Sequence, residues 1–78
     1  MNDFDAANVK EILAEILDLL NSTTPTAAKI RTLEDASRMA VLAIETSTLH
    51  GNASASIAAT LADAVIRATI NELKKAKP

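Results

Sequence analysis

The chain contains no cysteine, tryptophan or tyrosine, and it has one glycine, one phenylalanine and one histidine among its 78 residues. Without cysteine, neither a disulfide nor a thiolate metal site can form. A single histidine also excludes a multi-histidine metal site within one chain. Because aromatic residues are almost absent, the core should consist of leucine, isoleucine, valine and alanine. No cofactor motif is present either, so we expect no bound metal and no cofactor.

The sequence has no excess of basic residues, no recognisable signal peptide and no long apolar run; its one basic cluster is Lys74, Lys75 and Lys77. The formal net charge is −2, with 8 basic against 10 acidic residues, which argues against binding to a nucleic-acid phosphate backbone. Residues 1–5 are acidic where a signal peptide would be basic. No apolar run reaches the length of about 18 residues that a membrane span needs. The sequence thus predicts a cytoplasmic protein that binds neither nucleic acid nor a membrane.

Residues 6–20 are predicted to form one amphipathic helix. Asp5 is the predicted N-cap, with Phe4 and Val9 placed to form a hydrophobic staple across it. Apolar residues recur at the spacing of a single helical face: Val9, Ile12, Leu13, Ile16, Leu17 and Leu20. Charged residues occupy the opposite side, so this helix needs only one partner surface.

Residues 25–49 are predicted to form a longer helix. Thr24 is the predicted N-cap, and Pro25 suits the first turn, where an amide hydrogen is not needed. The helix should end before Gly51, which can adopt the left-handed conformation of a helix terminus. Its second half carries apolar residues on two sides rather than one, which indicates two packing surfaces.

Residues 53–75 are predicted to form the third helix, with Asn52 or Ser54 as its N-cap. Its polar residues occupy a narrow stripe of about 80°: Ser56, Thr60, Asp63, Arg67, Asn71 and Lys74. Most of its remaining surface is apolar, which is typical of a helix surrounded by others. The predicted fold class is therefore all-α, with residues 1–78 as a single domain. A long helical hairpin and the shorter first helix should form a three-helix antiparallel bundle.

The helical repeat assigns the apolar residues of this bundle to two faces. One face is expected to form the core within the chain: Ile12, Ile16, Leu20, Ile30, Leu33, Ile44, Ile57 and Leu61. The other face is expected to lie in or near an interface with a second copy: Met39, Leu42, Leu49, Ile66, Ile70 and Leu73. Since a chain of this size buries too little surface to be very stable alone, we expect a homodimer to complete the bundle.

Two clusters of reactive side chains have simpler structural interpretations. Ser47 and His50 are spaced as a nucleophile and a base could be on a helix, but no third group orients them. His50 is therefore interpreted as a helix-terminal residue. The acidic residues of the first helix, Glu11, Glu15 and Asp18, are expected to be solvated rather than bound to a metal. We assign no catalytic residue from the sequence.

Three functions are compatible with these features. The first, which we expect, is a non-enzymatic interaction module that self-associates through the second apolar faces of residues 25–49 and 53–75 and could also bind another protein. The second is a small acidic regulator or inhibitor of the antitoxin type, whose apolar face binds a protein target. The third is a small all-helical enzyme with a site between subunits, for which the candidate residues are Arg38, Glu45 and Arg67.

Overall fold

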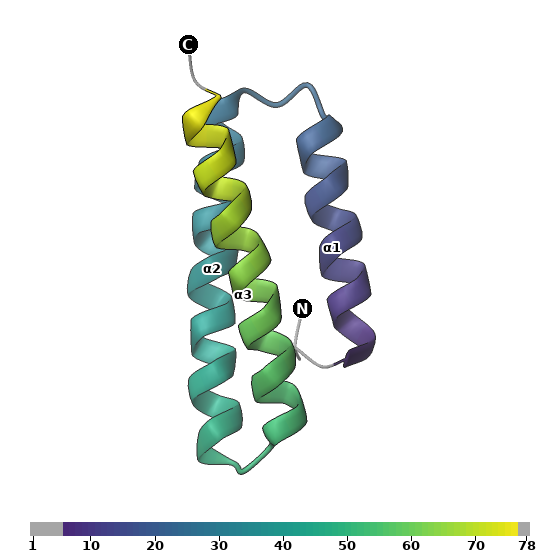
Figure 1. Cartoon of the computed structure of the whole chain (residues 1–78), viewed down its shortest axis with the longest axis vertical. Coiled ribbons are helices and arrows are strands. Elements are labelled where there is room, and N and C mark those ends of the chain that lie inside the picture. Colours follow the sequence, from purple (N-terminus) through teal and green to yellow (C-terminus); the bar gives the residue numbers. More distant parts are fainter. Residues whose placement is uncertain (1–5, 77–78) are drawn as a thin grey trace.

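The computed structural model describes residues 6–76, in which three helices follow one another: α1 (Ala6–Asn21), α2 (Thr26–Leu49) and α3 (Ala53–Lys75). α1 and α3 run in the same direction, and α2 runs against both (Figure 1). No strand occurs in this part of the chain, which confirms the all-α prediction. The predicted N-cap Asp5 and its staple residue Phe4 lie outside the described residues.

The connection between α1 and α2 differs by one residue from the prediction. Pro25 is the N-cap of α2, and its carbonyl accepts the first helical hydrogen bond from the amide of Lys29 at 3.0 Å. No side chain caps this end, so the prediction that Thr24 is the N-cap is wrong. The amide of Thr24 instead donates to Ser22 Oγ at 3.3 Å, while that hydroxyl donates to the carbonyl of Leu19 at 2.7 Å. The Ser22 hydroxyl therefore organises the turn.

The connection between α2 and α3 is a helix terminus with a left-handed glycine. Gly51 has a φ of +69°, and its amide donates to the carbonyl of Thr48 at 3.1 Å. The next amide, of Asn52, donates to the carbonyl of Ser47 at 2.8 Å, which completes a Schellman motif. The Asn52 side chain then accepts the amide of Ala55 at 3.1 Å and so caps α3. The predicted roles of Gly51 and Asn52 are confirmed.

α2 and α3 pack closely along their length because small side chains line their contact. Ala40 on α2 and Ala59 and Ala62 on α3 are completely buried. Alanine side chains keep the distance between two packed helices short, since that distance depends on the residues at the contact. Leu33 and Ile66 are the largest side chains that are fully buried among the described residues. The α2–α3 hairpin therefore contains most of the buried residues of the described structure.

α1 packs mainly against α3, and Figure 1 shows it standing beside the α2–α3 hairpin rather than against both helices equally. It contributes Ile12 and Ile16 to the core cluster that also contains Ile66 and Ile70 of α3. With 16 residues against 24 and 23 in the other helices, α1 also leaves part of the hairpin uncovered. These two features leave apolar side chains of the bundle without a partner.

Ile66→Ala should lower the free energy of unfolding by about 2–5 kcal/mol, because it leaves a cavity in a close-packed core. Ile66 is 1% exposed, whereas Leu49 is 86% exposed. Leu49→Ala should therefore change the same quantity by less than about 0.5 kcal/mol. Urea titrations followed by circular dichroism measure both variants. Equal losses in the two variants would show that Ile66 is not a core residue.

Gly51→Ala should cost about 1–2 kcal/mol of folding free energy, because the left-handed conformation is unfavourable for a residue with a Cβ atom. The cost is purely conformational, since a Cβ at this position would meet no atom within 4 Å. Gly51→Asn should cost less, because asparagine tolerates this conformation. Thermal and urea denaturation of the two variants test this order of stabilities. An alanine variant as stable as the asparagine variant would refute it.

Candidate interaction surfaces

The six residues predicted for an interface do not share one surface. The exposed members, all on α2, are Met39, Leu42 and Leu49. Leu73 is half-buried against the core, whereas Ile66 and Ile70 are part of it. The prediction that placed Ile66 and Ile70 on an outer face of the bundle is therefore wrong. Both residues pack inside a single protomer.

Two residues that were expected in the core are on the outside of α3. Ile57 is 62% exposed and Leu61 is 57% exposed, so their assignment to the core is wrong. The helical repeat does separate two apolar faces of α3, but it does not tell which of them is the inner face. The hairpin instead packs on the face that carries Ala59 and Ala62, because small residues allow the closer contact.

The other residues expected in the core are at least partly buried. Ile12, Ile16 and Leu33 are buried in the core cluster. Three more are partly buried and pack against this cluster: Leu20, Ile30 and Ile44. On α1, however, Leu13 and Leu17 of the predicted single apolar face are exposed, so that face is only partly covered.

One exposed apolar surface lies on α1 and α3, and we refer to it as the α1–α3 flank. Its large residues are Leu13, Leu17, Ile57, Leu61 and Val65. Leu13 and Leu17 are one turn apart on α1, and the three α3 residues also follow one another at intervals of one turn. Each helix therefore presents a ridge of apolar side chains along its length.

A second surface is a groove between α1 and α2, which we refer to as the α1–α2 groove. It has a volume of about 590 Å³. Its lining is Ile12, Glu15, Ile16, Asp18, Leu19, Ser22, Thr24, Thr32, Leu33, Ala36, Met39 and Ile66. Leu13 and Leu17 each lie two residues from Glu15, which is about 160° around the helix. The flank and the groove are therefore on opposite sides of α1.

A polar network lies on the third side of the bundle, between α2 and α3. The carboxylate of Asp63 is almost buried and accepts a hydrogen bond from the Ser37 hydroxyl at 2.6 Å. Its second oxygen pairs with Nε of Arg67 at 2.8 Å. No buried side-chain nitrogen or oxygen within the described residues lacks a hydrogen-bond partner. The network therefore satisfies a buried charge and links the two helices of the hairpin.

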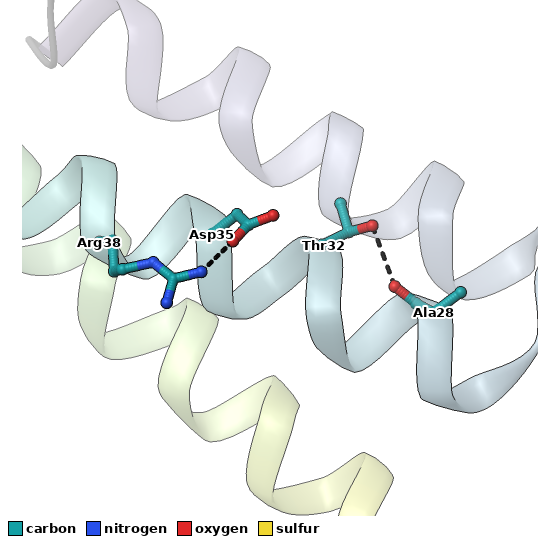
Figure 2. Close-up of polar contacts among 4 residues, drawn as sticks. All are labelled: Ala28, Thr32, Asp35 and Arg38. Atoms are coloured by element: carbon teal, nitrogen blue, oxygen red, sulfur yellow. Dashed lines mark hydrogen bonds and ion pairs between the residues drawn. The ribbon is translucent and has the colours of Figure 1, made fainter.

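The candidate residues for an enzyme between subunits are only partly brought together. Arg38 and Arg67 line two shallow clefts beside this network, but Glu45 lines neither of them. Arg67 is paired with Asp63, and Arg38 is paired with Asp35 on the exposed surface of α2 (Figure 2). Each guanidinium group therefore already has a carboxylate partner in the same helix.

The two clusters of reactive side chains considered in the sequence lie on the surface of the helices. His50 is exposed at the C-cap of α2, and its amide donates to the carbonyl of Thr46 at 3.1 Å. Glu11, Glu15 and Asp18 are exposed along α1. Within residues 6–76, no group of three or more histidine, aspartate or glutamate residues is arranged to hold a metal ion.

α3 is long and apolar enough to cross a membrane when judged by length and composition alone. Its most apolar window has a mean hydropathy of 1.3, and 39% of that window is buried inside the protein. The core helix of a soluble protein meets the same two criteria, and α3 supplies most of the buried residues of this bundle. These criteria therefore do not assign the helix to a membrane.

Comparisons with protein-family models, with curated proteins and with solved structures find no match to this chain. The α1–α3 flank and the α1–α2 groove are the features of the described structure that bear on its function.

Ser37→Ala should lower the free energy of unfolding by about 1.5–3 kcal/mol, the range for a hydrogen bond to a charged group. The variant removes the hydroxyl that reaches Asp63 from the other helix. Thr32→Ala is the control, because its hydroxyl bonds the Ala28 carbonyl within α2 at 3.0 Å on the exposed surface (Figure 2). The control should change stability by less than about 0.5 kcal/mol.

A double-mutant cycle with Asp63→Ala isolates the contribution of the pair. Ser37→Ala combined with Asp63→Ala should cost less than the sum of the two single changes, because the contact is lost only once. Strictly additive losses in urea denaturation would mean that the contact between Ser37 and Asp63 contributes nothing to the hairpin.

Proposed function

We propose that this protein is a small, non-enzymatic helical interaction module that self-associates as a symmetric homodimer through the α1–α3 flank. The observation that carries the proposal is the row of large apolar side chains left outside α3, of which Ile57 and Leu61 are the most exposed. Contiguous exposed apolar surface of this kind marks association sites in soluble proteins. In a dimer, each copy would bury the apolar side chains that the other copy exposes to water.

The accessible surface of the chain supports the same conclusion. The chain exposes 5352 Å², whereas a compact monomer of 8.2 kDa exposes about 4500 Å². The chain is elongated, 44 × 18 × 15 Å, and α1 packs mainly on one side of the hairpin. A second copy would therefore have accessible surface to cover.

The composition of the α1–α3 flank suits contact between identical copies. In a two-fold symmetric interface the same surface meets itself, so any charge at its centre faces a like charge. The α3 part of the flank consists of uncharged residues: Ile57, Leu61, Ala64, Val65 and Ala68. The exposed Ala64 and Ala68 would also allow the α3 helices of two copies to approach closely.

Leu61→Glu combined with Val65→Glu should convert the dimer to a protomer, because the change places charges at the centre of a two-fold interface. We expect the dissociation constant to rise at least ~100-fold, which corresponds to about 2.8 kcal/mol. Light scattering behind a sizing column, across a dilution series, measures the mass. Circular dichroism should show unchanged helicity, because both positions are exposed in the protomer.

Leu42→Glu is the control for this experiment. Leu42 is as exposed as Leu61 but lies on α2, outside the proposed interface. The control should therefore keep the mass of the dimer, which is twice the protomer mass of 8.2 kDa. A wild-type protein of protomer mass at every concentration would contradict the proposal. So would a dimer that Leu42→Glu disrupts and the flank variant preserves.

A further inference from the structure

The α1–α2 groove results from the unequal packing of α1. The alanine contact holds α2 against α3, and α1 then rests mainly on α3. The floor of the space left beside α2 is apolar and includes Ile12, Ile16, Leu33 and Ile66. Met39 on α2 is half-exposed at its edge. The volume of about 590 Å³ lies within the range of specific binding pockets, about 300–1,000 Å³.

Both charged residues that line this groove are acidic. Glu15 and Asp18 of α1 belong to the lining, and Glu11 lies one turn before Glu15 on the same side of the helix. The residues that line the groove in the described structure include no lysine or arginine. Lys29 lies at one end of the groove, where its ammonium group donates to the carbonyl of Leu20 at 2.9 Å. Along the α1 side, an apolar floor with an acidic edge is complementary to an apolar ligand with a basic flank.

We propose that the α1–α2 groove binds an amphipathic helix of another protein, with leucine-like residues on one face and lysine or arginine along the side of that face that meets α1. Helices commonly bind in apolar grooves through residues spaced by three or four positions. On α1 the lining extends from Ile12 to Ser22, which is about 15 Å at 1.5 Å per residue. This length accommodates about three turns of a partner helix.

A second copy of the chain fits the groove less well than such a helix. α1 has exposed leucines, but its charges are mostly acidic and would meet the acidic edge of the groove. The basic residues Lys74 and Lys75 lie at the end of α3, where the neighbouring apolar residues Ile70 and Leu73 already pack in their own protomer. Neither α1 nor α3 therefore offers an unoccupied apolar face with basic flanks, and on α2, Arg38, which is near the exposed Leu42, is paired with Asp35. The proposal concerns a surface separate from the α1–α3 flank, and it does not depend on dimerisation there.

A labelled model peptide of leucine and lysine tests the charge and the shape of the expected partner. The peptide, about 18 residues long and arranged as an amphipathic helix, is titrated with the full chain by fluorescence anisotropy. Two peptides serve as controls: one with glutamate in place of lysine, and one with the same leucines and lysines in scrambled order. The helical leucine–lysine peptide should bind at least ~10-fold more tightly than either control.

A matched pair of variants locates the binding. Met39 and Leu42 are both on α2 and are 54% and 56% exposed, but only Met39 lines the groove. Met39→Lys should weaken binding of the leucine–lysine peptide at least ~10-fold, because a like charge then stands at the edge of the groove. Leu42→Lys makes the same charge change outside the groove and should leave affinity within about twofold. Circular dichroism checks that both variants keep their helicity.

The outcomes separate this proposal from the proposed dimer. Equal affinity for the lysine and glutamate peptides, or equal loss in the Met39→Lys and Leu42→Lys variants, would overturn the binding of a basic helix in the groove. A dimer that Met39→Lys dissociates in light scattering would show that the groove binds a second copy instead, which overturns both proposals. A flank variant that is monomeric yet still binds the leucine–lysine peptide would support both.

Discussion

The close contact between α2 and α3 determines the rest of this structure. Ala40, Ala59 and Ala62 are completely buried at that contact, where larger side chains would hold the helices further apart. Ile66 and Ile70 of α3 are buried on the same side of the helix as these alanines, whereas Ile57, Leu61 and Val65 remain outside. The charge of Asp63 is accommodated beside the contact by the Ser37 hydroxyl and by Arg67. The face of α3 that packs in the hairpin thus leaves its other apolar face in water.

The position of α1 follows from the same contact and divides the unpartnered surface into two. On one side, the α1–α3 flank is apolar and, along α3, uncharged, which suits contact with an identical surface. On the other side, the α1–α2 groove combines an apolar floor with Glu15 and Asp18 at its edge. Like charges disfavour self-association there and favour a basic partner. The dimer is therefore proposed from an apolar surface on one side of α1, and the basic partner from an acidic edge on its opposite side.

The three helices could be predicted from the sequence, but the faces through which they pack could not. Helix bounds, the left-handed Gly51 and the Asn52 cap were predicted, since each depends on residues close together in the chain. The inner face of α3 was not, because Ile66 and Leu61 have the same apolar character and only the packing against α2 distinguishes them. The groove could not be predicted either, since it depends on how far α1 stands from α2. The acidic side of α1 was recognised, but its place beside an apolar floor was visible only in the fold.

The reactivity of single introduced thiols tests the orientation of α3 most directly, because the chain has no cysteine of its own. Leu61→Cys should react rapidly with a thiol reagent in dilute folded protein, and more slowly at concentrations where the flank is covered by a second copy. Ile66→Cys should be protected at every concentration under folding conditions, as its burial requires. If Ile66→Cys reacted as rapidly as Leu61→Cys in folded, dilute protein, the alanine-lined face would not be the core and the account would fail.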